Sequence, residues 1–584
     1  MATVLVPNDV TAVIDNPGDV QSNLLETPDS HATCASQPQS TKANTKTCDD
    51  NQPDQDVLII GGGFSGISAL YRVRKLGLRG LILEAGSGFG GVWHWNRYPG
   101  ARVDSEYPFY QLNVPEGHKG FNFAQRFPDH HELRRYMDHL AKSLSLHDHA
   151  QLNTTVVSCT YSATTSLWTI KSADGRSFSA KYLICATGLL HRSYSPDFPG
   201  VQSYKGGIYH SSSWPDKVSF AGKKVCLVGA GATAVQITQK LAKETADSGT
   251  LTVLMRRPST CVPMRQRTLS KNDNDILRGY YSALLEKGRQ SHTGFPISSA
   301  GCSLFAHSPE QRNELFEELW ERGAFNFLLG GYIDTVVDVN ANNEVYAFWA
   351  KKVRARISDP RKKDLMAPLK PMYSFGTKRP PLENDYYECL DMKHVEIISV
   401  IENPIESFTA SGITFSDGTH EDFDAVVLAT GFDSFTGSLF NLGLTNRDGV
   451  DIKETWRDGV RTYLGMFMSG FPNAFILYSP HAPTAFSNGP TIIECQCDYI
   501  VDVIDRLEKQ NAKSIEPTAE AENEWRDLLN SMIEGSLMAT TDSWWNGGNI
   551  PGKKKQVMTF AGGIPQYEAL AREKLDGWKG FIVQ

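Results

Sequence analysis

Two stretches of the chain share one pattern, in which a short apolar run leads through a glycine-rich turn into an amphipathic helix. In the first, the apolar residues 57–60 predict a buried strand, and Gly61, Gly63 and Gly66 follow with G-x-G-x-x-G spacing. Such glycines permit a tight turn, and the helix N-terminus behind them attracts a pyrophosphate. Glu84 closes the next apolar run 23 residues after Gly61, near the roughly 20 residues expected for a carboxylate that binds ribose. We therefore predict a dinucleotide site rather than a plain strand–turn–helix unit.

The second stretch, residues 223–242, repeats the pattern with Gly229, Gly231 and Ala234 at the turn. Its next apolar run, residues 251–255, ends in Arg256 and Arg257 instead of an acid. Two guanidinium groups suit a 2′-phosphate through bidentate hydrogen bonds, so the pair favours NADP over NAD. The remaining alternative is a solvated basic pair.

The rest of the pattern predicts an α/β fold with two Rossmann-like dinucleotide-binding domains. Residues 131–145 have helical periodicity, residues 151–184 indicate strands, and two apolar strands end in Ala-Thr-Gly, at 186–188 and at 429–431. We predict a first nucleotide domain from residues 55–188 and 425–584, a second from residues 189–261 and 371–424, and a helical insertion in the second over residues 262–370. A loop at residues 540–553, with two tryptophans among its glycines, is a candidate lid.

Composition narrows the class of protein. The chain is 40% hydrophobic and 21% charged, with a formal charge of −8, which argues against a nucleic-acid partner. It has no apolar run of about 18 residues, so no membrane span is expected. Its ten cysteines form no CxxC pair and no metal-ligand pattern, and the first residues do not resemble a secretion signal. We expect no metal and a reducing, cytoplasmic setting.

Residues 1–54 differ from the rest because they are polar and acidic, with eight acidic residues against two lysines. Such a segment buries too little apolar surface to order itself. We predict a disordered extension.

The segment 90–110 is unusually aromatic for a loop, with Trp93, Trp95, Tyr98 and Tyr107. One interpretation is a packed surface loop that ends in an exposed ion pair between Arg102 and Asp104. The other is a wall over an aromatic ring system such as a flavin, and we favour this second interpretation.

Three segments together resemble the flavin-dependent Baeyer–Villiger monooxygenase family. YKGGIYHSSSWP (204–215) is similar to the family fingerprint, with Tyr204 in place of its Phe, and GGVWHWNRYPGARVD (90–104) and FGTKR (375–379) also match. The resemblance covers about residues 55–584. It implies FAD, NADPH and O2 as reactants, with a C4a-peroxyflavin that attacks a ketone to give an ester or lactone.

The resemblance also implies roles for individual residues. Arg379 would stabilise the flavin adducts, Asp104 would orient Arg379, Lys378 and Arg257 (with Arg256 adjacent) would hold the 2′-phosphate, and Trp544 would contact the nicotinamide nucleotide. The implied contacts with FAD are Gly61, Gly63, Ser65, Gly66, Glu84, Val92, Trp93, His94, Trp95, Arg102, Val103, Asp104, Tyr110 and Val156. The implied contacts with NADP are Gly229, Ala230, Gly231, Ala232, Thr233, Ala234 and Val235.

Some assignments stay open at this point. His210 suits a backbone-bonding role between domains better than proton transfer. An N- or S-hydroxylating flavin monooxygenase would share both nucleotide turns, and a non-catalytic flavin-binding regulator would share at least the first. Apolar residues near Leu189, Leu190 and 482–489 favour a bulky, hydrophobic, secondary-metabolite-like ketone.

Overall fold

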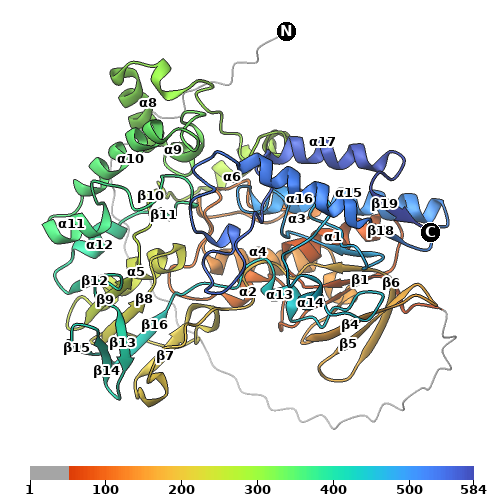
Figure 1. Ribbon diagram of the computed structural model, residues 1–584, viewed down its shortest axis with the longest axis horizontal. Helices are drawn as coiled ribbons and strands as arrows, with labels where there is room; N and C mark the ends of the chain where they lie inside the picture. The colour runs from red at the N-terminus through yellow and green to blue at the C-terminus, as the bar shows by residue number, and fades with distance from the viewer. Residues whose placement is uncertain (1–51) are drawn as a thin grey trace. The chain divides into compact units, whose positions relative to one another are not determined.

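The computed structural model describes residues 52–584. All but the last three residues of the predicted extension 1–54 therefore lie outside the described residues. The described part has the predicted α/β fold, built on two main sheets with helices packed against them (Figure 1).

The first main sheet has seven strands in the order β3-β2-β1-β6-β5-β4, with β17 also paired to β6. The strands are β1 (Gln55–Ile60), β2 (Gly80–Leu83), β3 (Ala150–Gln151), β4 (Val156–Ser162), β5 (Leu167–Ser172), β6 (Ser177–Cys185) and β17 (Ala474–Ile476). In the parallel register Ile60 lies opposite both Leu83 and Cys185. The first glycine turn, Glu84 and the first Ala-Thr-Gly therefore meet at one edge of this sheet.

The second main sheet is parallel throughout, in the order β12-β9-β8-β16-β7. Its strands are β7 (Gly207–His210), β8 (Lys224–Val228), β9 (Thr250–Met255), β12 (Val395–Ser399) and β16 (Ala425–Leu428). The three-stranded antiparallel sheet of β13 (Ile405–Phe408), β14 (Gly412–Phe415) and β15 (His420–Asp422) precedes β16 in the chain.

One predicted boundary is wrong. We assigned residues from 425 onward to the first domain, but β16 lies between β7 and β8 in the second sheet, with Leu428 opposite Val228. The cause is that both strands ending in Ala-Thr-Gly are apolar on both faces, as expected of any interior parallel strand. This pattern identifies a buried strand but does not say which sheet it joins, so the chain leaves the second sheet only after residue 428.

The predicted insertion over residues 262–370 contains six α-helices joined by loops, and one strand, β10 (Val262–Pro263), which pairs with β11 (Leu382–Glu383). Its helices are α6 (Lys271–Arg278), α7 (Tyr281–Arg289), α8 (Pro309–Arg322), α9 (Asn326–Leu329), α10 (Val339–Arg354) and α11 (Pro360–Met366). An aromatic cluster joins α8, α9 and α10: Phe327 stacks on Phe348 at 5.5 Å, and Phe316 lies against both.

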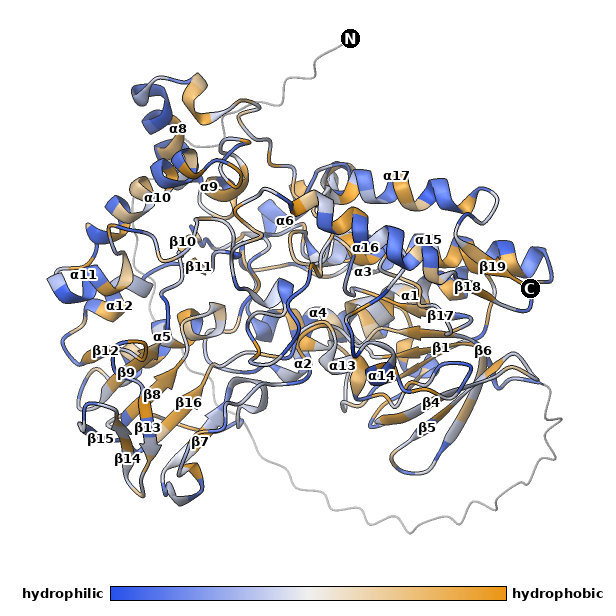
Figure 2. Ribbon diagram, viewed as in Figure 1, coloured by the Kyte–Doolittle hydropathy of each residue, from blue (hydrophilic) through white to orange (hydrophobic). Residues whose placement is uncertain are grey.

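The remaining helices cover the sheets. They are α1 (Phe64–Lys75), α2 (Val92–Trp95), α3 (Pro115–His118), α4 (His130–Ser143), α5 (Ala232–Glu244), α12 (Tyr386–Asp391), α13 (Gly437–Phe440), α14 (Ile452–Thr455), α15 (Gly489–Lys509), α16 (Ala519–Ile533) and α17 (Gly563–Leu575). The long helix α15 packs along α1, and the C-terminal strand β19 (Phe581–Val583) pairs with β18 (Ile515–Pro517). Apolar residues concentrate in the strands, while α15 and α17 alternate polar and apolar faces (Figure 2).

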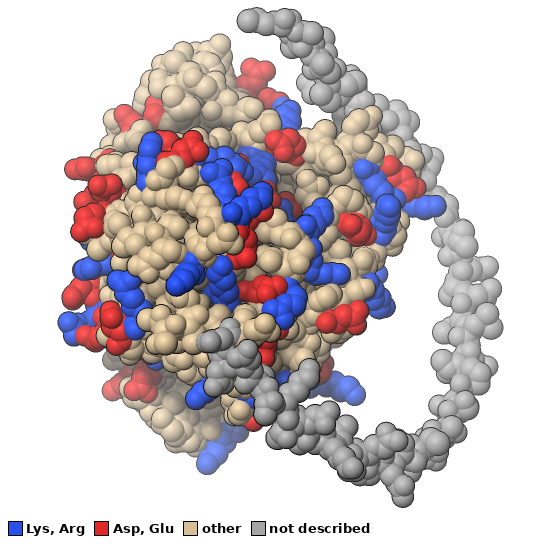
Figure 3. Space-filling model, turned by 90° about the vertical axis from the view of Figure 1, so that its right-hand side faces the viewer, with Lys and Arg blue, Asp and Glu red and all other residues tan. Residues whose placement is uncertain are grey.

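Acidic and basic side chains intermingle on the face seen in Figure 3. No helix between residues 52 and 584 combines the length and apolar character that crossing a bilayer would require.

Candidate active site

The first glycine turn is shaped for close approach by a ligand. A Cβ on Gly66 would lie 1.9 Å from the carbonyl oxygen of Gly61, so α1 can pack this closely on the turn only with glycine at that position. Helix α1 has no side-chain cap and no acid in its first turn, whereas Asp129 caps α4 and Ser308 caps α8. Uncapped N–H groups at a helix N-terminus bind anions, so the turn fits a pyrophosphate.

Glu84 faces this turn, as the spacing predicts. Its Oε2 accepts the N–H of Gly62 at 2.5 Å and its Oε1 accepts the N–H of Gly86 at 2.7 Å, and the side chain is buried. Val156, at the start of β4, is also buried and packs in the same core cluster as Leu83.

The aromatic segment after the turn packs back onto α1. The indole Nε1 of Trp93 donates to the Tyr110 hydroxyl at 3.1 Å, and the ring of Tyr110 lies edge-on to Phe64 at 5.1 Å. Two further members of the expected FAD set make contacts within the protein. Trp95 is 37% exposed beside His191, and the guanidinium of Arg102 donates to the Gln125 side chain and to the carbonyl of Phe127.

The same segment reaches the second nucleotide unit. Gln236 on α5 accepts from the Tyr98 hydroxyl at 2.9 Å and donates to the carbonyl of Arg102 at 2.9 Å. The segment therefore spans from the first glycine turn to the second.

The second turn resembles the first. Gly231 precedes α5 without a side-chain cap, and a Cβ there would meet no heavy atom within 4 Å. Ser259, just after the arginine pair, donates to the carbonyl of Ala230 at 2.5 Å. The turn is thus open toward a ligand and is tied to the segment that carries Arg256 and Arg257.

Arg379 and Asp104 form a bidentate ion pair although they are 275 residues apart in the chain. Nε donates to Oδ2 at 2.7 Å and Nη2 to Oδ1 at 2.8 Å. Such a fork fixes both the position and the plane of the guanidinium. Asp104 raises the pKa of Arg379 above its usual value, even though burial opposes the charge.

The other side of the Arg379 guanidinium is incompletely satisfied. Nη1 lies 3.4 Å from the carbonyl of Ser487 and 3.5 Å from that of Ala485, beyond the roughly 2.7–3.2 Å of a good hydrogen bond. Its face lies 4.8 Å from the ring of Phe325, which comes from the helical insertion. The result is a fixed cation whose Nη1 makes only long hydrogen bonds to two backbone carbonyls.

Lys378 lies in a second, mainly cationic group. Burial, reinforced by Arg257 and Arg256, lowers the pKa of Lys378 to about 8, and Asp542 opposes this shift. Its ammonium lies 4.6 Å from the ring centre of Tyr373, whose hydroxyl donates to Pro258 and accepts from the Thr260 N–H. Two arginines close enough to lower the pKa of the lysine form, together with it, a suitable site for a phosphate dianion.

Two further expected residues have definite surroundings. Trp544, within the short helix η5 (Trp544–Asn546), stacks on Phe435 at 5.7 Å. His210 lies with Nε2 3.3 Å from the Tyr194 carbonyl and Nδ1 2.8 Å from the Ser212 hydroxyl. These contacts match the backbone-bonding interpretation of His210, and burial lowers its pKa.

The comparisons with known proteins identify the family. Residues 54–261 match the family model described as flavin-binding monooxygenase-like. The chain is 40% identical over 90% of its length to the FAD-binding monooxygenase acrE of Aspergillus aculeatus, of which it covers 89%. It is 38% identical over 90% of its length to cyclopentanone 1,2-monooxygenase of Comamonas sp., of which it covers 95%.

A solved structure agrees. Cyclohexanone monooxygenase from Rhodococcus sp. Phi1 bound to NADP+ superposes with a TM-score of 0.86 at 32% identity, over 91% of this chain and 99% of that one. The chain belongs to the flavin-dependent Baeyer–Villiger monooxygenase family. The enzyme is an FAD- and NADPH-dependent monooxygenase.

One relative of the chain is named for a different activity. Phenazine N-monooxygenase PhzNO1 of Lysobacter antibioticus is 33% identical over 92% of this chain and is covered to 98%. Family membership therefore does not by itself decide between ketones and nitrogen heterocycles.

Several residues at this site escaped the sequence reasoning. Phe325 reaches Arg379 from the insertion, Tyr373 joins the two cationic segments, and Asn342 on α10 bonds both the N–H and the carbonyl of Phe375 at 2.9 Å. Their contacts join segments distant in the chain, and no local spacing signals them. Only Tyr373 lies close in sequence to a recognised segment, two residues before FGTKR.

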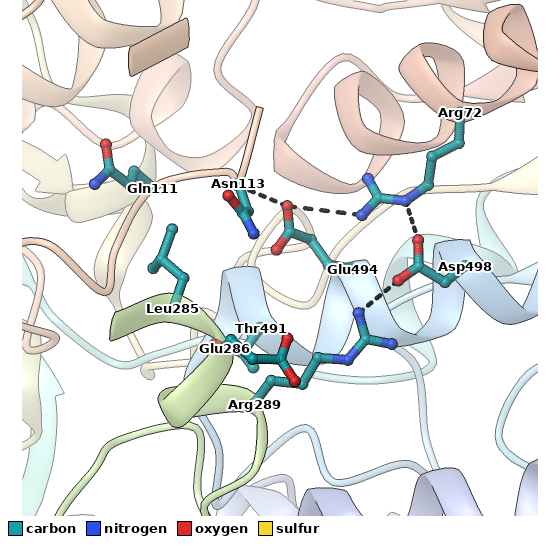
Figure 4. A pocket seen from close by; sticks show the side chains of 9 residues that line it. All are labelled: Arg72, Gln111, Asn113, Leu285, Glu286, Arg289, Thr491, Glu494 and Asp498. Carbon is teal, nitrogen blue, oxygen red and sulfur yellow. Dashed lines mark hydrogen bonds and ion pairs between the residues drawn. The ribbon is translucent and has the colours of Figure 1, made fainter. Parts of the chain in front are cut away.

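A second group of buried charges lies apart from the glycine turns (Figure 4). Arg72 on α1 and Arg289 on α7 both contact Asp498 on α15 at 2.5 Å, and Glu494 accepts the Asn113 N–H at 2.7 Å. A cavity of about 150 Å³ lies beside them.

Proposed function

We propose that this enzyme converts a ketone into the corresponding ester or lactone with NADPH and O2, and that Arg379 and Asp104 form its catalytic pair. The observation that carries the proposal is the bidentate pair, with Nη1 held only by two long hydrogen bonds to backbone carbonyls. The name of the relative cyclopentanone 1,2-monooxygenase, which acts on a ketone, supports it.

The two nucleotide sites follow from the two uncapped turns. We propose that FAD lies at the turn before α1, with Glu84 at its ribose and Trp93 and Tyr110 at its ring, and that NADPH lies at the turn before α5. The open space at Gly231 and the cations Lys378, Arg256 and Arg257 support the second assignment. Bound FAD supplies the transfer of electrons from NADPH to O2.

Arg379 acts on the ketone. As oxygen is inserted, negative charge develops on the former carbonyl oxygen, and a donor fixed in advance at that point is often worth roughly 3–4 kcal/mol. A guanidinium stays protonated at working pH, so it stabilises this charge without giving up a proton. Asp104 holds the fork in one plane and thereby removes the cost of orienting it during the reaction.

The substrate we propose is bulky and hydrophobic, in the manner of polycyclic secondary metabolites. Phe325 covers one face of Arg379, and Leu189 is buried in the core cluster that also contains Phe435 and Trp545. An aromatic ring over the guanidinium, with apolar residues in the neighbouring core, favours a large apolar body with one carbonyl group.

The experiment is product analysis. Purified enzyme with FAD, NADPH and 18O2 is given small cyclic, linear and polycyclic ketones beside phenazine as the nitrogen-containing competitor. We expect an ester or lactone with one 18O atom, and faster turnover of the polycyclic ketones. Conversion of phenazine to an N-oxide without any ester would favour the N-hydroxylating alternative, and absence of flavin reduction by NADPH would favour a non-catalytic protein.

A further inference from the structure

The turn that carries Lys378 and Arg379 is anchored through Thr377, a fully buried residue. Thr377 donates its hydroxyl hydrogen to the carbonyl of Ser374 at 2.6 Å, and its own N–H bonds the same carbonyl at 3.3 Å. The hydroxyl oxygen and the carbonyl of Thr377 are therefore available as acceptors.

Both acceptors are used by one loop from the C-terminal part of the chain. The hydroxyl of Thr541 donates to the Thr377 hydroxyl at 2.9 Å, and the indole Nε1 of Trp545 donates to the Thr377 carbonyl at 3.1 Å. Thr541 and Trp545 are both buried, and Trp545 packs on Phe486 at 5.5 Å. Buried hydrogen bonds of this kind are costly to leave unmade.

The same loop is fastened at a second place. Trp544 stacks on Phe435, Asn549 donates to the carbonyl of Phe432 at 3.1 Å, and Lys553 pairs with Asp433 at 2.7 Å. Adjacent tryptophans therefore contact different segments: Trp544 the segment 432–435, and Trp545 the arginine turn. The loop is a physical connection between the two.

The opposite side of the arginine turn is held by the insertion, because Asn342 bonds both backbone groups of Phe375. The turn thus lies between a fixed helix and a loop. Pro380 and Pro381 follow Arg379 and have no N–H to donate.

We propose that Trp545 and Thr541 are positioning residues for Arg379, which fasten the candidate lid 540–553 to Thr377 and so hold the guanidinium in its working place. The proposal rests on the proposed function only where it speaks of catalysis. The fastening itself is a property of the folded chain.

The first test is hydrogen exchange of the FAD-bound enzyme without substrate. The reporters are the N–H groups of Phe375 and Thr377 in a peptide over residues 372–381. Trp545→Phe keeps the ring but loses the donor, and we expect exchange in this peptide to be roughly tenfold faster, the equivalent of about one buried hydrogen bond. Trp578→Phe is the matched control, because its indole donates to Gln510 in an exposed place, and it should leave the peptide unchanged.

The second test uses Thr541. Thr541→Val should accelerate exchange in the same peptide roughly fivefold, and Thr541→Ser, which keeps the hydroxyl, should restore the wild-type rate. With a ketone that the wild-type enzyme converts, Trp545→Phe and Thr541→Val should yield less ester and more hydrogen peroxide per NADPH, while the KM for NADPH changes less than twofold. Melting temperature and flavin content show whether each variant is folded.

The outcomes separate the two proposals. Unchanged exchange in residues 372–381 in folded Trp545→Phe and Thr541→Val enzyme overturns the inference. If Trp545→Phe does not fold, the Thr541 pair decides alone. If the wild-type enzyme makes no ester from any ketone, the proposed function fails, while the exchange experiment still decides whether the loop fastens the turn.

Discussion

Two groups of partly buried arginines and carboxylates in this enzyme differ in how completely they are satisfied. In the cluster around α15, Arg72 contacts Asp498, and Arg289 contacts both Asp498 and Glu568 at 2.5 Å. At the Arg379–Asp104 pair, one guanidinium forms an ion pair with one carboxylate. Its Nη1 lies beyond good hydrogen-bond distance of the nearby carbonyls.

The difference shows what separates a structural charge cluster from a candidate site. The cluster joins α1, α7, α15 and α17, and all three guanidinium nitrogens of Arg289 bond to carboxylates within it, while Nη2 of Arg72 lies 3.7 Å from Glu494. A cavity lies beside it (Figure 4). At the Arg379–Asp104 pair, Asp104 fixes the guanidinium and Phe325 covers one of its faces. Nη1 makes only long hydrogen bonds within the protein.

The largest effect should come from Arg379→Ala. Loss of the one fixed donor to the carbonyl oxygen should reduce ester formation about 100- to 1000-fold, or roughly 3–4 kcal/mol, while NADPH still reduces the flavin. Ester yield and flavin reduction are measured separately on the same preparation. Ester formation at the wild-type rate would remove Arg379 from the mechanism.

Removing one arginine from the cluster around α15 should instead affect stability. Arg289→Ala leaves Asp498 and Glu568 without their shared cation, which should cost about 2–3 kcal/mol of unfolding free energy, with flavin reduction unchanged. The control is Arg322→Ala, because Arg322 forms an exposed pair with Glu318, where about 0.5 kcal/mol or less is expected. Denaturant unfolding compares the two, and equal losses would show that the cluster is no more important than a surface pair.

The group of Lys378, Arg256 and Arg257 extends the comparison to a third kind of charge cluster, in which positive charges predominate. Arg257→Ala should raise the KM for NADPH about 10- to 100-fold, since a charge-assisted hydrogen bond to phosphate is worth roughly 1.5–3 kcal/mol, and should leave the KM for NADH nearly unchanged. Steady-state kinetics with both nucleotides measure this. Equal changes for both would mean that Arg257 does not read the 2′-phosphate.

The smallest effect concerns pH. Burial raises the pKa of Glu494 to about 7, and that of Glu522 also to about 7. An acid whose folded-state pKa is raised binds its proton better in the folded state, so its contribution to stability is full at low pH and is lost as the pH rises through 7. Between pH 6.5 and 8, Glu494 should account for about 1 kcal/mol of this loss.

Glu494→Gln should therefore remove about 1 kcal/mol of the fall in stability over that range, and Glu522 contributes a similar amount. The buried His130 and His481, whose pKa values burial lowers to about 4 and about 3, add a rise in stability near pH 6.5, where unfolded histidines lose their protons, and this rise is the same in both enzymes. Thermal unfolding at several pH values is the measurement. An unchanged slope would show that Glu494 titrates normally.

The local parts of the fold could be predicted because their signals are local. Strand, glycine turn and helix follow one another within about twenty residues, and Glu84 faces the first turn as its spacing indicates. The sheet that β16 joins could not be predicted, since an apolar strand looks the same in either sheet. The Arg379–Asp104 pair came from resemblance, and the structure adds its bidentate geometry.

The residues that support Arg379 could not be predicted from the sequence. Phe325, Asn342 and Trp545 come from three different segments, and Trp545 reaches Thr377 across 168 residues of chain. Only Trp545 stands in a segment that the sequence marks, the candidate lid 540–553, and nothing in that segment indicates its contact with Thr377. Only the folded arrangement shows that one short turn is held from all three directions.

The measurement that tests the account most directly is the ratio of ester to hydrogen peroxide per NADPH in Arg379→Lys enzyme. Lysine keeps a positive charge but cannot form the fork with Asp104, and it can act as an acid. The account predicts that ester formation falls nearly as far as in Arg379→Ala, with peroxide rising in its place. A lysine variant that makes ester at the wild-type rate would show that charge alone is sufficient and would contradict the central role given to the fixed guanidinium.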